Sequence, residues 1–253
     1  MRPDGRALDA LRPTTIEIDY LRAPLASALV RAGETWVLCT ASVDEQQPPF
    51  LRAQKSESGW VTAEYNMLPG STAQRTSRGA NGRAKEIERL IGRSLRAAVD
   101  LMALGPRTLT IDCDVLQADG GTRTAAITGG WVALALGVHR LQQRGLIPAG
   151  RHPVQRQVAA ISVGLVEGEL RLDLPYLEDA RAEVDMNIVM ARPAVRDGDG
   201  GAAGSFVEVQ GTGEHGTFSR GQLDGLLTLA EAGVASLFRL QDAALSLVTA
   251  SQA

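Results

Sequence analysis

The alternation of apolar and polar residues predicts strands near the start of the chain. The run TTIEIDY, residues 14–20, alternates apolar with polar side chains, which is typical of a half-buried strand. The run SALVRAGETWVLCTASV, residues 27–43, has the pattern of two strands joined by a turn at residues 32–34. The sequence therefore predicts a β-meander over residues 14–43. Residues 44–82 contain several proline and glycine turns and predict irregular structure.

Helical periodicity begins after this irregular region. We expect a helix to open at Arg83, because apolar residues then recur every three or four positions on one face. These residues are Ile87, Leu90, Ile91, Leu95, Ala98, Val99 and Met102. Gly105-Pro106 is expected to end this helix. Residues 107–117 then predict a strand, and the mostly apolar residues 125–145 predict a buried central helix.

The second half of the chain repeats the order of strands followed by a helix. Residues 158–174 predict a hairpin that turns at Glu167-Gly168. The runs VDMNIVMARP and FVEVQGT predict two more strands, separated by a Gly-rich flexible loop at residues 192–205. Ser219, with Gln222 three residues later, predicts a capped C-terminal helix.

This order of elements predicts an α+β fold with two similar βα halves packed as one compact domain. The domain is expected to span residues 1–253, with halves at residues 10–140 and 156–222 and the C-terminal helix at residues 219–247. The repetition is one of architecture, since the two halves show no strong similarity in sequence.

Composition excludes several protein classes. Hydrophobic residues make up 44% and charged residues 22% of the 253 residues, near the average for globular proteins, which argues against disorder. The uncharged residues 124–138 are fewer than the roughly 20 that a membrane helix needs. The first 13 residues lack the apolar region of a secretory signal, so we expect a cytoplasmic protein with no membrane partner. Cys39 and Cys113 are expected to be buried free thiols.

Charge is concentrated in two segments. Residues 75–96 contain seven cationic and two acidic side chains, although the whole chain has a net charge of -3. Residues 167–185 contain seven acidic and two cationic side chains. The basic segment favours a local site for a polyanion. Solvated charges, or charges that pair with each other, would give the same pattern.

A glycine-containing junction, GGTRT at residues 120–124, precedes the apolar helix. Glycines allow a left-handed backbone, and the amides at a helix N-terminus bind anions readily. Arg123 adds a full positive charge and a planar set of donors. The junction predicts a phosphate cradle, although a similar sequence often forms only a turn. Arg83 could present a second guanidinium near a helix N-terminus, or it could be an ordinary surface arginine.

Asp179 and Asp185 form a carboxylate cluster with neighbouring glutamates. Mg²⁺ prefers one or two carboxylates together with waters and substrate oxygens, and carboxyl groups also serve as general acids or bases. A solvated acidic loop is the alternative. However, Asp185 interrupts an apolar strand, so we expect it to be partly buried and to need a proton, metal or donor. The sequence has no histidine pair at a metal-ligand spacing and no signature of a covalent nucleophile.

Seven segments, taken in order, are specific enough to indicate a family. They are MRPDGR, VLCTASV, GWVTAEYNMLPGST, EIERLIGRSLRAAVDL, TIDCDVLQADGGTRTAAITGG, YLEDARAEVDMNIVM and VEVQGT. The chain closely resembles the bacterial ribonuclease PH family over nearly its whole length. The resemblance implies a ring-shaped homohexamer, a trimer of dimers, that acts as a phosphate-dependent 3′→5′ exoribonuclease and nucleotidyltransferase. Inorganic phosphate, the co-substrate, would release nucleoside diphosphates from tRNA precursors and other RNA 3′ ends.

The resemblance also implies roles for individual residues. It implies phosphate binding by Arg83, Gly121, Thr122 and Arg123, catalysis and metal binding by Asp179 and Asp185, and RNA binding by Arg75 and Arg78. The implied metal is Mg²⁺ or Mn²⁺. The chain departs from the family at Gly70, where arginine is usual, and in a shorter stretch over residues 69–83. Both departures reduce the positive charge of the RNA-binding loop.

Two other functions remain open on the sequence alone. A catalytically silent ring subunit would bind RNA or partners without cleaving RNA. Arg83, Arg123 and Asp185 argue against it, because a silent subunit has no need of a phosphate loop together with carboxylates. A phosphate-binding enzyme that does not act on RNA would explain the GGTRT loop but not the basic segment.

Overall fold

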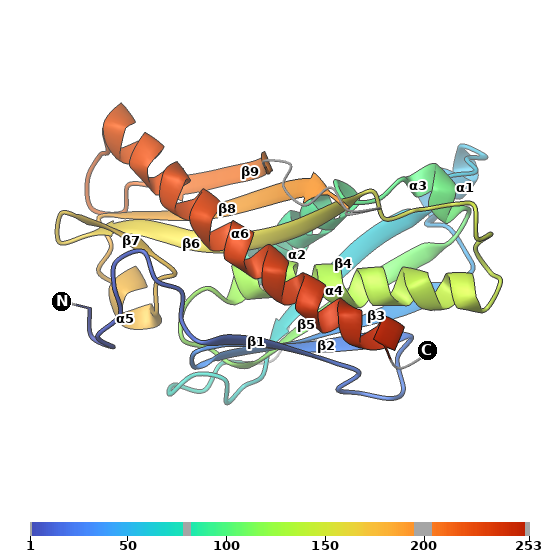
Figure 1. The fold of residues 1–253 in the computed structure, drawn as a ribbon, viewed down its shortest axis with the longest axis horizontal. Coiled ribbons are helices and arrows are strands. Elements are labelled where there is room, and N and C mark those ends of the chain that lie inside the picture. The colour runs from blue at the N-terminus through green and yellow to red at the C-terminus, as the bar shows by residue number, and fades with distance from the viewer. Residues whose placement is uncertain (1, 78–81, 195–203, 251–253) are drawn as a thin grey trace.

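The computed structural model describes residues 2–77, 82–194 and 204–250, without the side chains of residues 248–250. Within these residues the strands form two sheets (Figure 1). The first sheet has the order β1-β2-β3-β5-β4 and the second has the order β7-β6-β8-β9. The strands are β1 (Thr14–Ile18), β2 (Ala26–Ala32), β3 (Thr35–Asp44), β4 (Trp60–Met67), β5 (Thr108–Gln117), β6 (Arg156–Val166), β7 (Glu169–Leu172), β8 (Val184–Pro193) and β9 (Ser205–Thr212).

Six helices connect or cover these strands within the described residues. They are α1 (Pro49–Ala53), α2 (Gly82–Arg96), α3 (Leu101–Leu104), α4 (Thr122–Gln143), α5 (Tyr176–Asp179) and α6 (Arg220–Ala250). The predicted meander, the hairpin at Glu167-Gly168 and the strand over residues 107–117 are confirmed.

Helix α4 lies between the two sheets (Figure 1), which confirms the prediction of a buried central helix. It packs against β2 and β3 on one side and against β6 on the other. Gly129 allows the close approach to the first sheet, because a Cβ atom there would lie 2.5 Å from Cγ2 of Val30 and 2.9 Å from Sγ of Cys39. Cys39 and Cys113 are buried free thiols, as predicted.

Helix α6 covers the other face of the second sheet. Its buried residues Leu226, Ala230 and Val234 pack in a cluster with residues of β6, β7 and β8. The predicted capping box is present, because the Ser219 backbone amide donates to Oε1 of Gln222 at 2.8 Å and the Gln222 amide donates to Oγ of Ser219 at 3.2 Å. These two bonds satisfy donors at the helix N-terminus that would otherwise lack partners.

Replacing Ser219 with alanine is expected to lower the free energy of unfolding by about 1 kcal/mol, the typical cost of losing a cap. Urea denaturation followed by circular dichroism measures the change. Ser236→Ala is the matched control, because Ser236 lies within the same helix, where its hydroxyl donates to the carbonyl of Ala232 and accepts from Arg239 but caps no helix end. The free energy of unfolding of Ser236→Ala is expected to change by less than about 0.5 kcal/mol. Equal losses in the two variants would contradict the capping role.

The prediction of irregular structure over residues 44–82 is wrong at β4. This strand pairs in parallel with β5, and Val61, Ala63 and Tyr65 are buried on one of its faces. Parallel pairing joins segments that are far apart in the sequence, so no hairpin signal marks it. The short helix α1 also lies in this region.

The helix predicted from Arg83 to Met102 ends earlier, at Arg96. Val99 instead forms an isolated bridge with Val154, and the Asp100 amide donates to the carbonyl of Pro153 at 2.7 Å. The Asp100 side chain then caps α3 by accepting from the amides of Met102 and Ala103. Contacts with the linker between the halves therefore override the helical periodicity.

Residues 195–203, most of the Gly-rich loop predicted at 192–205, lie outside the described residues. In the part of the chain that the structure describes, no helix combines the length and the apolarity that a membrane crossing requires.

Candidate active site

The GGTRT junction forms the N-terminus of α4. Gly120 and Gly121 have φ angles of 72° and 66°, in the left-handed region that glycine adopts readily. The first helical hydrogen bond runs from the Ala125 amide to the carbonyl of Gly121 at 3.0 Å. The amides of residues 122–124 find no acceptor among the described residues, which is the usual state of a helix N-terminus. These amides are therefore free to bind an anion.

Gly120 also brings the junction against the start of α5. A Cβ atom on Gly120 would lie 2.5 Å from the carbonyl oxygen of Leu174 and 2.9 Å from the amide nitrogen of Tyr176. Both of these neighbours are backbone atoms, so they cannot move away as a flexible side chain could. The contact therefore requires glycine.

Replacing Gly120 with alanine is expected to lower the free energy of unfolding by about 2 kcal/mol, because the residue combines a left-handed φ with a backbone clash. Gly150→Ala is the control, since a Cβ atom there would meet open space. The free energy of unfolding of this control is expected to change by less than about 0.5 kcal/mol. Urea denaturation of the two variants measures the difference, and a Gly120→Ala protein as stable as the control would contradict the close approach.

Tyr65, on β4, supports the junction from the first sheet. Its hydroxyl lies 2.8 Å from the hydroxyl of Thr122, and both side chains are buried. Burial raises the pKa of the Tyr65 hydroxyl above its ordinary value, although the hydrogen bond to Thr122 acts in the opposite direction. Tyr65 is therefore a neutral partner of the cradle. Tyr65 was not a candidate from the sequence, because β4 itself was not predicted.

Arg123 is held between the two halves of the fold. Its Nη1 donates to Oε1 of Gln210 on β9 at 3.2 Å and lies 3.8 Å from Oε1 of Glu86 on α2. Gln210 in turn donates through Nε2 to Oε1 of Glu86 at 3.1 Å. The Arg123 side chain remains 19% exposed, so its guanidinium is oriented but still accessible.

Arg83 lies in the first turn of α2 and lines a cleft with a volume of about 310 Å³. Tyr65, Asp114 and Ser77 line the same cleft. Because Tyr65 also touches Thr122, the cleft adjoins the N-terminus of α4.

Asp179 and Asp185 lie beside these arginines. Asp179 is the last residue of α5, and Asp185 is the second residue of β8. Burial raises the pKa of Asp185 to about 6, the negative charge of Asp179 adds to this effect, and the positive charges of Arg123 and Arg83 oppose it. Burial also raises the pKa of Asp179, against the charges of Arg83 and Arg123.

Oδ1 of Asp185 is buried and has no hydrogen-bond partner among the described residues. A buried carboxylate oxygen without a partner is costly, so it is suited to a proton or a bound cation. The predicted partial burial of Asp185 is confirmed. Glu214, in the segment after β9, raises the pKa of both aspartates through its charge and was not a candidate from the sequence.

The structure thus brings together Arg83, Arg123, Asp179 and Asp185, which come from four different elements. Across the described ranges no group of three or more His, Cys, Asp or Glu side chains has a metal-binding arrangement. Two carboxylates are nevertheless sufficient for Mg²⁺ when substrate oxygens and waters supply the other ligands.

The basic segment at residues 75–96 is partly neutralised within the chain. Lys85 pairs with Glu88 at 2.7 Å, and Arg93 pairs with Glu208 at 2.8 Å. The Arg96 guanidinium stacks 4.4 Å from the ring centroid of Trp60. The alternative of paired charges is therefore correct for Lys85 and Arg93. Arg75, Arg83 and Arg89 are exposed, and Arg78 lies outside the described residues.

Comparisons with known proteins show which family the chain resembles. Residues 10–137 match the model of the 3′ exoribonuclease family, domain 1, and residues 156–233 match that of domain 2. The chain is 52% identical to a protein named ribonuclease PH from Corynebacterium kroppenstedtii, over 97% of this chain and 93% of that protein. It is 53% identical to a ribonuclease PH from a Synechococcus strain, over 97% of this chain and 98% of that protein.

Solved structures share the fold. Rice Rrp46 has a TM-score of 0.72 and 22% identity, over 98% of this chain and 100% of that chain. The Archaeoglobus fulgidus exosome with RNA bound to the active site has a TM-score of 0.76 and 20% identity, over 94% of this chain and 91% of that chain. The predicted α+β fold is confirmed.

The sequence-based predictions of a ribonuclease PH relative and of a phosphorolytic 3′→5′ exoribonuclease are also confirmed, and the silent ring subunit is not favoured. Both family models match, and together they cover more than half of the chain. The chain therefore belongs to the 3′ exoribonuclease family.

Proposed function

We propose that this exoribonuclease holds inorganic phosphate against the free amides of α4, Arg123 and Arg83, and that the bound phosphate attacks the last phosphodiester bond of an RNA 3′ end. A phosphate oxygen would form a bond to the phosphorus of the terminal nucleotide. The bond from that phosphorus to the 3′-oxygen of the preceding nucleotide would break. The products would be a nucleoside diphosphate and an RNA shortened by one nucleotide, whose 3′-oxygen takes up a proton.

The juxtaposition of an anion cradle with two partly buried carboxylates carries this proposal. The amides and guanidiniums aim and neutralise phosphate, so catalysis is mostly positioning and electrostatic stabilisation. Asp185 is suited to the proton transfer when protonated, because its pKa of about 6 lies near neutral pH. When ionised, it is suited to hold a cation together with Asp179.

The proposed cation is Mg²⁺ or Mn²⁺, and the residues fit it. Asp185 offers a buried carboxylate oxygen without a partner, and Asp179 supplies a second carboxylate beside it. Bound there, the ion would neutralise the charge that develops on the scissile phosphate.

The proposed substrates are the 3′ ends of tRNA precursors and other RNAs. The exposed Arg75 and Arg89 are suited to contact an RNA backbone without reading its sequence. The proposal includes a homohexamer, a trimer of dimers, in the cytoplasm, without a membrane partner. The archaeal exosome of similar fold, solved with RNA at its active site, supports the RNA substrate class.

A direct test uses the purified protein, Mg²⁺ and an RNA with a single-stranded 3′ tail, with and without inorganic phosphate. We expect nucleoside diphosphates, formed only when phosphate is present. Nucleoside monophosphates formed without phosphate would indicate hydrolysis and would contradict the role of the GGTRT junction. RNA binding without any cleavage would instead support the silent ring subunit.

A further inference from the structure

The N-terminal segment, residues 2–12, runs across the second half of the fold beside β7 and α5 (Figure 1). A backbone hydrogen bond joins it to β7, from the Leu172 amide to the carbonyl of Leu8 at 2.8 Å. The segment carries three arginines that point inward from it, Arg2, Arg6 and Arg12. Arg2 and Arg12 are buried, which is rare for arginine unless the charge is paired.

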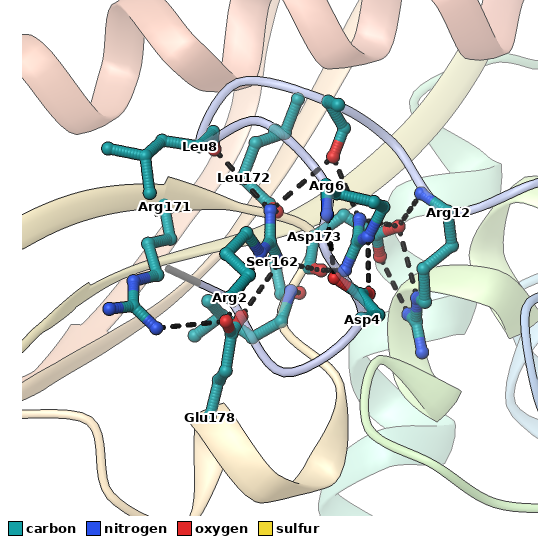
Figure 2. Close-up of polar contacts among 12 residues, drawn as sticks. Arg2, Asp4, Arg6, Leu8, Arg12, Ser162, Arg171, Leu172, Asp173 and Glu178 are labelled. Carbon is teal, nitrogen blue, oxygen red and sulfur yellow. Dashed lines mark hydrogen bonds and ion pairs between the residues drawn. The ribbon is translucent and has the colours of Figure 1, made fainter.

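Arg2 is bound to the helix that carries Asp179. Its Nε and Nη2 donate to the two oxygens of Glu178 at 3.1 and 2.7 Å, and Arg171 donates to the same carboxylate at 2.9 Å (Figure 2). The Glu178 side chain is 2% exposed. Arg2 also donates to the carbonyl oxygens of Leu172 and Asp173, at 2.8 and 2.9 Å. Arg2 thus joins the end of β7 to α5.

Glu178 directly precedes Asp179 in α5, which has only four residues and no side-chain cap at its N-terminus. So short a helix has little stability of its own. The bidentate contact with Arg2 fixes the orientation of Glu178, because a guanidinium and a carboxylate pair in a defined plane. By holding Glu178, Arg2 fixes the backbone of α5 from which the Asp179 side chain projects.

Arg12 is bound to the other side of the site, the phosphate junction. Its Nη2 and Nε donate to the carboxylate of Asp173 at 2.6 and 3.1 Å, while its Nη1 donates to the carbonyl oxygen of Asp119 at 2.6 Å. Asp119 directly precedes the GGTRT junction, and its Oδ1 accepts from the Tyr176 amide at 3.0 Å. The Arg12 guanidinium therefore connects the second half of the fold to the backbone that enters the cradle.

Stability alone does not explain these two buried arginines. A buried ion pair often contributes no more to stability than apolar side chains of the same volume, because its charges must leave water. Its specific property is a fixed geometry of several directional bonds. Arg2 makes such bonds to α5, which carries Asp179, and Arg12 makes them to the backbone that enters the phosphate cradle. The distance between these two places decides how bound phosphate meets the carboxylates.

We propose that the N-terminal segment is a positioning element for the reaction. Arg12 fixes the position of the phosphate cradle, and Arg2 fixes the position of Asp179. The inference rests on the proposed phosphorolytic function. It assigns different kinetic roles to two residues of one segment, neither of which touches the reacting atoms.

The test compares Arg2→Gln, Arg12→Gln and the control Arg140→Gln in phosphorolysis assays at varied inorganic phosphate. Arg140 makes the same kind of contacts as Arg12, to the carboxylate of Asp19 at 2.6 Å and to the carbonyl of Leu25 at 2.9 Å. It lies about 25 Å along α4 from Arg123, at a rise of about 1.5 Å per residue. The control is expected to keep kcat and KM within about twofold of the unmodified protein.

Arg12→Gln is expected to raise the KM for phosphate at least about tenfold with a smaller change in kcat, because a displaced cradle binds phosphate weakly. Calorimetric titration with inorganic phosphate should show the same loss of affinity without turnover. Arg2→Gln is expected to lower kcat at least about tenfold with the KM for phosphate within about twofold. Circular dichroism and size-exclusion chromatography establish that each variant is folded.

If a glutamine variant does not fold, the corresponding lysine variant keeps the charge but loses the bidentate geometry. The lysine variants are then expected to show the same pattern, with a KM for phosphate raised about threefold or more at Arg12 and a kcat lowered about threefold or more at Arg2. Equal falls in kcat with an unchanged KM in both variants would show a purely structural role and overturn the inference. Absence of phosphorolysis in the unmodified protein would overturn the proposed function instead.

Discussion

Arg123→Ala is expected to abolish measurable phosphorolysis, lowering kcat/KM by about 10³-fold, while the fold is retained. Arg123 supplies a full charge at the helix N-terminus where phosphate is proposed to bind. Removing a single aligned donor from an anion-stabilising site typically costs about 10²–10³-fold in rate, and a guanidinium supplies charge as well as donors. The expected loss is therefore at the upper end of this range.

Folding should survive this substitution for a local reason. Arg123 donates to Gln210 and approaches Glu86, and these two residues remain hydrogen-bonded to each other at 3.1 Å without it. The variant leaves Oε1 of Gln210 without this donor, but Gln210 is only partly buried, so water can take the place of the guanidinium. Release of nucleoside diphosphate at high phosphate concentration measures activity, and thermal unfolding measures stability.

Arg239→Ala serves as the control for the loss of an arginine. Arg239 lies on α6 and donates to the hydroxyl of Ser236 at 2.9 Å, away from the cradle. The phosphorolytic activity of Arg239→Ala is expected to match that of the unmodified protein. A fully active Arg123→Ala protein would contradict the assignment of the phosphate cradle.

Local patterns predicted the elements whose partners lie nearby in the sequence. The β1–β2–β3 meander and the β6–β7 hairpin were predicted because adjacent antiparallel strands alternate apolar and polar residues around short turns. The cap at Ser219 was predicted because its partner Gln222 is three residues away. Helix α4 was predicted from a continuous apolar run long enough to be buried on all sides.

Contacts between distant segments could not be predicted in the same way. Strand β4 pairs with β5 more than 40 residues later, and its apolar positions are interrupted by Glu64 and Asn66 on the other face. Tyr65 was consequently missed, although the alternation of Val61, Ala63 and Tyr65 was a usable signal. This alternation indicates a strand, but it does not indicate the distant parallel partner that buries Tyr65.

The residues of the candidate site also divide into those that the local sequence indicates and those that depend on distant partners. Asp185 could be identified because a carboxylate within an apolar strand is unusual in any context. Arg2 and Arg12 could not, because their acidic partners Glu178 and Asp173 lie more than 160 residues away. A charged residue carries no local sign that it will be buried, since its burial depends entirely on the partner that the fold supplies.

Asp185→Asn is expected to lower kcat by about 10²–10⁴-fold, the usual contribution of a general acid or base, while RNA affinity changes far less. The amide can neither give up a proton at neutral pH nor bind a cation as a carboxylate does. Single-turnover cleavage of a 3′-tailed RNA measures the rate, and filter binding of the same RNA measures affinity. Equal losses of rate and affinity would indicate a structural role for Asp185.

The same substitution is expected to stabilise the protein when divalent cations are removed. Burial, together with the charge of Asp179, raises the pKa of Asp185 in the folded chain to about 6, whereas its ordinary value is 3.8. The folded state therefore binds a proton more tightly than the unfolded state does. As pH rises from about 4 through about 6, the unmodified protein loses stability that the uncharged asparagine variant keeps.

The stability difference therefore has a defined pH dependence. Asp185→Asn should be more stable than the unmodified protein at pH 8, by no more than about 3 kcal/mol for a shift of this size, and should lose this advantage near pH 4. Urea denaturation in the presence of a chelator measures it. Added Mg²⁺ should stabilise the unmodified protein by mass action and leave the variant unchanged. An asparagine variant that is less stable at pH 8 would contradict the burial of an unpaired charge, which the proposed catalytic role of Asp185 requires.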